Sequence, residues 1–224
     1  ELRHDECHAL IGPNGAGKST LINLVAGNLA LESGRVILDG TDISHHSMPQ
    51  RARAGLGRTF QITSIIPGFS VLENVALAAQ AKDGSSFRFL GRAAFERDLN
   101  DRAQAALATL GLSHRAYVRS ADLSHGEHRL LELAMAIVGE PRALLLDEPM
   151  AGMGKGEGAA LTETLLTLKK QMPMLLIEHD MEAVFKLADR ISVLAYGQIV
   201  ATGTPDAVRA DEKARAAYLG SDAA

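Results

Sequence analysis

Short apolar runs alternate with amphipathic segments along most of this chain. Three runs, Cys7–Ile11, 143–146 and Met174–Ile177, are short and largely apolar, as expected of strands buried on both faces of a sheet. Apolar side chains at helical spacing, with capping or breaking residues at the ends, predict helices over Lys18–Ala26, 124–138, 157–171, 181–188 and 205–219. Strands that alternate with helices predict an α/β fold with a mostly parallel sheet.

Two further segments have hairpin features, whereas the middle of the chain has little strand signal. Residues 35–38 precede an Asp39-Gly40 turn, and the apolar segment 191–201 is interrupted by Tyr196-Gly197. From residue 71 to 110 the sequence is Ala-rich and helical, with interruptions near 82–86 and at Gly91. We therefore expect residues 62–140 to form a helical insertion between two strands of the sheet.

Composition and charge narrow the class of protein. The chain has 23 Lys and Arg against 27 Asp and Glu, a formal net charge of −4, which excludes a generally basic nucleic-acid binder. A hydrophobic share of 46% is enough for a folded core, and a single cysteine excludes an internal disulfide framework. No apolar run approaches the roughly 18 residues that a membrane-spanning helix needs. We expect a folded protein with no nucleic-acid partner.

A glycine-rich segment between the first strand and the first helix predicts a phosphate site. It fits the pattern G-x-x-x-x-G-K-S/T, in which backbone N–H groups and a helix N-terminus surround phosphate oxygens. The candidate phosphate-binding residues are Gly12, Pro13, Asn14, Gly15, Ala16, Gly17, Lys18, Ser19 and Thr20. Lys18 would reach the β- and γ-phosphates of a nucleoside triphosphate, and the Ser19 hydroxyl would bind Mg²⁺. The alternative is an ordinary glycine-rich turn with a surface lysine.

Two carboxylates end the apolar run at 143–146. If this strand lies parallel and next to the first, Asp147 and Glu148 reach the sheet edge beside the phosphates. Asp147 would hold Mg²⁺, and Glu148 would act on the attacking water as a general base. An exposed turn is the alternative for this pair taken alone.

The segment Leu123, Ser124, His125, Gly126 and Glu127 resembles the L-S-G-G-Q signature of the ATP-binding subunits of ABC transporters. The resemblance covers essentially the whole chain. It implies a P-loop NTPase (RecA-like) fold, with a mostly parallel sheet and an inserted helical subdomain. In the family, this segment caps the γ-phosphate bound by the opposite subunit. His125 and Glu127 depart from the consensus, while Ser124 and Gly126 agree with it. Ser-x-x-Glu is also a helix capping box in its own right.

Three further positions match the same family. Gln61 resembles the glutamine that senses Mg²⁺ and the attacking water, and His179 resembles the histidine that contacts the γ-phosphate. The resemblance thus implies that Glu148, His179 and Gln61 are catalytic and that Ser19, Gln61 and Asp147 hold the metal. Residues 151–154 match a loop that usually ends in Asp, but Gly154 stands there. This departure puts side-chain communication through the loop in doubt, and 155–158 is an unusual helix start.

The resemblance divides the chain into three parts and narrows the function. Residues 1–61 would begin the nucleotide-binding core, 62–140 form the helical subdomain, and 141–224 complete the core with C-terminal helices. The segments 58–63, 148–153, 203–205 and 217–220 resemble those of ATP-binding subunits in importers of branched-chain amino acids. The implied cofactors are ATP and Mg²⁺. The implied partners are a second ATPase subunit, transmembrane permease subunits and, indirectly, a solute-binding protein. The implied location is the cytoplasmic face of the inner membrane.

Other functions stay open at this point. An importer of urea or other amides, or of other amino acids, is a near relative, and a non-transport ABC ATPase is a second alternative. A GTPase would need an N-K-x-D segment, which the sequence lacks, and a kinase would leave residues 123–127 unexplained. The chain looks truncated at its N-terminus relative to the family. No Phe, Tyr or Trp precedes Gly12. We therefore expect the nucleotide base to be held mainly through its phosphates and Mg²⁺.

Overall fold

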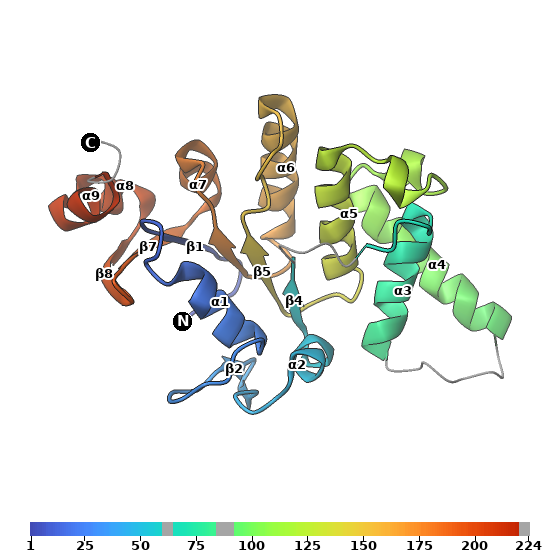
Figure 1. The fold of residues 1–224 in the computed structure, drawn as a ribbon, viewed down its shortest axis with the longest axis horizontal. Helices are drawn as coiled ribbons and strands as arrows, with labels where there is room; N and C mark the ends of the chain where they lie inside the picture. Colours follow the sequence, from blue (N-terminus) through green and yellow to red (C-terminus); the bar gives the residue numbers. More distant parts are fainter. Residues whose placement is uncertain (60–64, 84–91, 220–224) are drawn as a thin grey trace.

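The computed structural model describes residues 1–59, 65–83 and 92–219, with backbone alone at 92–96 and 218–219. Its main sheet has the strand order β4-β5-β6-β1-β7-β8 (Figure 1). The strands are β1 (Cys7–Ile11), β4 (Leu56–Arg58), β5 (Ala143–Asp147), β6 (Met174–Ile177), β7 (Arg190–Ala195) and β8 (Gln198–Gly203). All neighbours pair in parallel except β7 and β8, which form an antiparallel hairpin. β2 (Ile37–Leu38) and β3 (Thr41–Asp42) form a separate small antiparallel pair.

Helices cover both faces of this sheet. In Figure 1, α1 and α2 lie on one side, α5, α6 and α7 on the other, and α3 and α4 extend beyond the β4 edge. The helices are α1 (Lys18–Ala26), α2 (Met48–Ala54), α3 (Val71–Asp83), α4 (Arg92–Thr109), α5 (His125–Ile137), α6 (Lys155–Leu168), α7 (Met181–Leu187), α8 (Pro205–Ala210) and α9 (Glu212–Leu219). Short 3₁₀ turns at Ser113–Arg115 and Ser120–Asp122 connect α4 to α5.

The alternation of side chains along a strand divides the core into two layers. On β5, Leu144 and Leu146 join the large cluster beneath α3 to α7, whereas Ala143 and Leu145 join the cluster beneath α1. Leu144 and Leu146 are fully buried. Burial on both faces explains why this strand is apolar without interruption, as a doubly covered parallel sheet requires.

The predicted α/β class, the parallel sheet and the helical insertion are confirmed, but several elements differ from the sequence-based expectations. β4 and α2 were not predicted, because Leu56-Gly57-Arg58 has neither the length nor the alternation of a typical strand. The predicted helix over 205–219 is two helices, since the Asp211 carboxylate accepts a hydrogen bond from Ala214 N and caps a new start. β5 is not the neighbour of β1 that we expected, because β6 lies between them.

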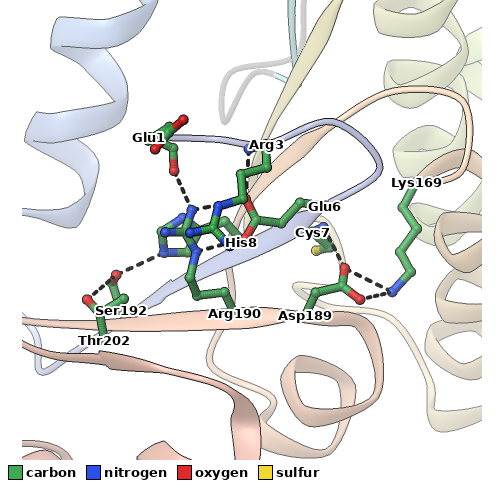
Figure 2. Close-up of polar contacts among 10 residues, drawn as sticks. All are labelled: Glu1, Arg3, Glu6, Cys7, His8, Lys169, Asp189, Arg190, Ser192 and Thr202. Carbon is green, nitrogen blue, oxygen red and sulfur yellow. Dashed lines mark hydrogen bonds and ion pairs between the residues drawn. The ribbon is translucent and has the colours of Figure 1, made fainter.

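A polar network joins β1 and β7 at their amino ends (Figure 2). Arg190 Nε donates to Glu6 Oε1 at 2.7 Å, and Cys7 N donates to the Asp189 carboxylate, which also pairs with Lys169. Burial alone would raise the pKa of Glu6, but hydrogen bonds from Arg190 and Arg3 N hold it below its ordinary value. Burial raises the pKa of the Cys7 thiol to about 12. This edge is opposite to the one that carries the phosphate loop.

Candidate nucleotide site

The phosphate loop turns sharply between β1 and α1 and depends on glycine at its first position. A Cβ at Gly12, where φ is +153°, would lie 2.0 Å from the carbonyl oxygen of Leu194 on β7. Lys18 curls back over the loop, and its Nζ donates to Gly12 O at 2.6 Å and Pro13 O at 3.0 Å. Burial lowers the pKa of Lys18, against the opposing effect of Glu148 and Asp147. The loop is thus a closed turn around a buried cation.

A polar cavity of roughly 190 Å³ lies at this carboxyl edge of the sheet. It is lined by Asn14, Gly15, Ala16, Gly17, Lys18, Ser19, Thr20, Glu148 and His179. The structure therefore brings together the predicted loop, the predicted base and the predicted histidine. Gly12 and Pro13 lie behind this lining and accept the Lys18 hydrogen bonds. The predicted residues Gln61, Ile62 and Thr63 lie outside the described residues.

Glu148 is positioned by its backbone and by His179. Its φ is +51°, a region that non-glycine residues seldom adopt, and its N–H donates to Ile177 O at 2.9 Å. Its Oε1 lies 2.7 Å from His179 Nε2. The two side chains remain partly accessible, at 31% and 50%. A carboxylate that is held from two directions and still open to the cavity can accept a proton from a molecule bound there.

Asp147 differs from Glu148 in being buried, with a side chain only 1% exposed. Within the described part of the chain, neither of its carboxylate oxygens accepts a hydrogen bond, and Arg58 Nη2 approaches to 3.8 Å. Burial raises the pKa of Asp147, against the lowering effect of Arg58. A buried carboxylate of this kind fits a cation. No group of three or more His, Cys, Asp or Glu suited to a metal occurs among the described residues, so such a cation would need phosphate or water ligands as well.

Two further residues, Glu178 and Arg58, support this site although no sequence motif indicated them. Glu178 is buried, and its carboxylate accepts hydrogen bonds from Met150 N at 2.8 Å and His179 N at 2.9 Å. It thereby fixes the loop after Glu148 relative to the one that carries His179. Arg58 donates to Asn23 Oδ1 on α1 at 2.9 Å. The available signal for Glu178 was its place directly after a buried strand, the same signal that identified Asp147.

The signature segment lies at the start of α5 and does not line this cavity. Ser124 is the N-cap residue, its Oγ accepts from Glu127 N at 3.2 Å, and its own N–H donates to Glu127 Oε2 at 2.8 Å. The predicted capping box is thus present. Burial alone would raise the pKa of Glu127, but hydrogen bonds from Arg115 and Ser124 lower it. Leu123 is buried, while Ser124 and His125 are exposed.

The signature segment packs against the loop at 151–154 and the start of α6. His125 Nε2 donates to Ala151 O at 3.2 Å, and a Cβ at Gly152 would lie 2.6 Å from that nitrogen. Likewise, a Cβ at Gly126 would lie 2.6 Å from Glu157 Oε1. α5 therefore begins directly against the loop at 151–154 and the first turn of α6. Within the unusual segment 155–158, Glu157 caps the helix start as well, because it accepts a hydrogen bond from Gly154 N.

A comparison with protein families decides the identity of the fold. The sequence model described as "ABC transporter" matches residues 1–151, about two thirds of the chain. The chain belongs to the ATP-binding subunits of ABC transporters. It is accordingly an ABC-type, ATP-hydrolysing transport subunit, and such subunits work with permease components. A second model, "Branched-chain amino acid ATP-binding cassette transporter", matches residues 198–224.

Curated relatives of this ABC subunit cover nearly the whole chain. It is 37% identical to the high-affinity branched-chain amino acid transport ATP-binding protein LivG of Salmonella typhimurium, over 98% of this chain and 89% of the relative. The probable LivG of Archaeoglobus fulgidus is 34% identical, over 95% of this chain and 84% of the relative. The lipopolysaccharide export system ATP-binding protein LptB of Haemophilus influenzae is 30% identical, with coverage of 98% and 88%.

Solved structures agree with the ABC fold. The ADP conformation of MJ1267, an ATP-binding cassette of an ABC transporter, superposes with a TM-score of 0.84 at 31% identity, covering 98% of this chain and 89% of that one. A nucleotide-free ATP-binding cassette also reaches 0.84, at 30% identity, covering 97% and 89%. Among the described residues of this ABC subunit, no helix combines the length and apolarity needed to cross a bilayer.

Proposed function

We propose that this ABC subunit hydrolyses ATP to power the uptake of branched-chain amino acids. Two findings support this cargo: the LivG relatives at 34–37% identity, and the match of residues 198–224 to a branched-chain amino acid cassette model. Similarity to LptB is lower, at 30%. The observation that carries the hydrolytic role is the carboxylate of Glu148, held 2.7 Å from His179 at the mouth of the phosphate cavity.

Hydrolysis in this proposal uses residues that follow β1, β5 and β6, together with Gln61. Residues 12–20 hold the triphosphate through backbone N–H groups and Lys18. Glu148 takes a proton from a water molecule while the water oxygen attacks the γ-phosphorus. The bond between the γ-phosphorus and the bridging oxygen breaks, which leaves ADP and inorganic phosphate. His179 orients the Glu148 carboxylate and contacts the γ-phosphate, and Gln61 orients the water.

A magnesium ion fits the proposal because Asp147 is a buried carboxylate without a hydrogen bond inside the described chain. Ser19, Gln61 and Asp147 would hold it together with phosphate oxygens and water. When bound, the ion supplies positive charge that neutralises the phosphate oxygens. Arg58, at 3.8 Å from Asp147, keeps that carboxylate partly compensated.

A second ATPase subunit is part of the proposal. Ser124 and Gly126 belong to a helix start that lies outside the subunit's own cavity, although hydroxyl and backbone N–H groups there are suited to an anion. The signature at 123–127 is therefore proposed to contact ATP bound by the opposite subunit. Two copies, or one copy and a close paralogue, would enclose two ATP molecules head to tail.

The groove between the core and the helical subdomain is proposed to receive a segment of the permease. A cavity of about 430 Å³ lies between α2 and β4 on one side and α3 and α5 on the other. Its wall is mainly apolar, with Arg53, Lys82 and Glu132 among the lining residues, so it suits an amphipathic helix end. The apolar residues Ile66 and Phe69, which are partly exposed, and Val71, which is fully buried, do not line this cavity.

The position of this groove supports two further proposals, on the division of the chain into domains and on the location of the subunit. We propose residues 1–61 and 141–224 as the nucleotide-binding core and 62–140 as the helical subdomain, because the groove lies where α2 and β4 face α3 and α5. Docking onto the permease would place the subunit at the cytoplasmic face of the inner membrane. A solute-binding protein would then act indirectly, from the other side of the permease.

The first test is Glu148→Gln, which keeps the side chain's size and removes its basicity. We expect ATP turnover to fall at least about a hundredfold while ATP binding persists, and an ATP-bound dimer to accumulate. Glu163→Gln is the matched control, because Glu163 lies on the exposed face of α6 with a side chain 65% exposed. Steady-state hydrolysis of Glu148→Gln equal to that of the parent would show that another group is the base.

The cargo needs a separate test. Reconstitution of the subunit with its permease in liposomes should give ATP-dependent uptake of leucine, isoleucine or valine. Uptake of urea or amides in place of these amino acids would leave the ATPase assignment intact and overturn the cargo.

A further inference from the structure

Glu178 is a buried carboxylate beside the proposed catalytic pair, although it does not itself line the phosphate cavity. It is only 5% exposed. A carboxylate is costly to bury unless hydrogen bonds or a cation compensate its charge. Backbone N–H groups do so here, because Oε1 accepts from Met150 N at 2.8 Å and Oε2 accepts from His179 N at 2.9 Å. One buried charge thus holds two separate loops.

These two loops are the ones that carry Glu148 and His179. They follow the neighbouring strands β5 and β6, which pair in parallel with Asp147 opposite Ile177. Glu148 N donates to Ile177 O at 2.9 Å, and this is where the two strands end. Met150 comes two residues after Glu148, and His179 directly follows Glu178. The carboxylate therefore joins the loops just beyond the sheet, where the strand ladder no longer holds them together.

The side chains of Glu148 and His179 are not held in place by burial. They are 31% and 50% exposed, and yet their Oε1 and Nε2 atoms lie 2.7 Å apart. For exposed side chains, the positions of the two backbones decide whether such a contact can form. The loop with Glu148 is closed on itself, since Ala151 N donates to Glu148 O at 3.1 Å. Its link to the loop with His179 is the Glu178 carboxylate.

We propose that Glu178 is a positioning residue for ATP hydrolysis, which aligns Glu148 with His179 through the backbone N–H groups of residues 150 and 179. The inference rests on the proposed function, because it takes Glu148 as the base. Both carboxylate oxygens are needed. A glutamine has one acceptor, and its NH₂ group would face the second N–H. A displacement of about 1 Å can cost about a hundredfold in rate, whereas ATP is held by the phosphate loop.

The test is Glu178→Gln, measured by the turnover of the dimer and by ATP calorimetry on the monomer. We expect kcat to fall at least about tenfold, and the Kd for ATP to stay within roughly twofold of the parent. Glu6→Gln is the matched control. Glu6 is also a buried carboxylate, 6% exposed, but it lies at the opposite edge of the sheet (Figure 2). This control should lose stability and keep its kcat. Equal losses of kcat in both variants, well below their Tm values, would overturn the proposal.

A double-mutant cycle shows whether Glu178 acts through the pair. In a His179→Ala background no pair is left to align, so Glu178→Gln should lower kcat by less than about threefold. An undiminished tenfold loss in that background would mean that Glu178 supports the fold independently of His179, and the proposal would be wrong.

Glu178→Asp is a second variant that keeps the charge and both acceptor oxygens. Its side chain is one methylene shorter, so it cannot reach both Met150 N and His179 N. We expect its kcat to lie between those of Glu178→Gln and the parent. A kcat equal to that of the parent would show that charge without reach is sufficient, against the proposal.

The outcomes distinguish this inference from the proposed function. If Glu148→Gln loses turnover and Glu178→Gln keeps it, Glu148 remains the base and only the role of Glu178 is refuted. If Glu148→Gln hydrolyses ATP as fast as the parent, the proposed function fails and this inference fails with it.

Discussion

Glu6 shows how a single buried carboxylate connects two strands that are distant in the sequence. It lies just before β1, is 6% exposed, and accepts hydrogen bonds from Arg190 on β7 and from Arg3 N. A carboxylate whose folded-state pKa is lowered stabilises the protein above its unfolded pKa, and that contribution is lost as the pH falls through the folded value. Because the pKa of Glu6 is lowered, its ionised carboxylate stabilises the folded state at neutral pH.

Glu6→Gln should therefore destabilise the protein at pH 7 by about 1.5–3 kcal/mol, the range for a hydrogen bond to a charged group. The difference from the parent should begin to shrink near about pH 4.3, the ordinary pKa of Glu, where the unfolded carboxylate takes up a proton, and shrink further as the folded Glu6 is protonated at lower pH. Urea unfolding of both proteins from pH 7 down to pH 3 measures it. A difference that stays constant over this range would mean that packing, and not the charge, holds Glu6 in place.

At this scale the sequence predicted residues that belong to a pattern and missed those that act through a neighbour. Lys18, Glu148 and His179 were found because each follows a strand and matches a motif, and they meet at one cavity. Arg58 and Glu178 were missed because their partners, Asn23 and the backbone N–H groups of Met150 and His179, are brought to them only by the fold. No local pattern contains that information.

Among the elements, the junction of α5 with the loop at 151–154 depends on two glycines. The imidazole of His125 occupies the space that a side chain at Gly152 would need, and Glu157 does the same at Gly126. Ala151 N also donates to Glu148 O at 3.1 Å. The start of α5 is therefore only a few bonds away from the proposed catalytic carboxylate.

Gly152→Ala should destabilise the fold by about 1–3 kcal/mol, because φ is +75° and the new Cβ meets His125. In a His125→Ala background, the steric part should disappear and only the backbone strain remain, giving a coupling of at least about 0.5 kcal/mol. Denaturant unfolding of the four proteins measures this coupling. Gly156→Ala is the control, since nothing lies within 4 Å of its new Cβ. Strict additivity would show that the two side chains do not interfere.

Elements with uninterrupted periodicity were the predictable ones. β1, α1 and β6 have the predicted bounds, because their apolar residues and their ends are set by local sequence. β4 and α2 were missed because tertiary contacts define them. A Cβ at Gly57 would lie 2.9 Å from Pro141, so this strand is a close approach of backbone to a neighbouring turn and not a packed apolar run. Arg51 on α2 is likewise buried against the carbonyls of Leu24 and Val25.

For the whole molecule, the separation of the signature from the phosphate cavity is the observation on which the proposed second subunit rests. Ser124→Arg should abolish ATP hydrolysis without weakening ATP binding by the monomer, because a bulky cation there blocks closure of the pair and leaves the cavity intact. Ser113→Arg, at an exposed 3₁₀ turn of the same subdomain, is the matched control. Calorimetry on the monomer and turnover of the dimer give the two quantities. Equal losses in both would place Ser124 in the cavity of its own subunit.

The position of β1 in the sheet has a consequence for the time at which the chain can fold during synthesis. Cys7 pairs with Met174 and His8 pairs with Arg190, so both neighbours of this central strand are made more than 160 residues after it. At about 5–20 residues per second, the strand waits on the order of 10–35 s for its partners. During this interval the phosphate loop has no β7 to rest on. The complete phosphate-binding site is therefore available to a nucleotide only when the last strands have left the ribosome.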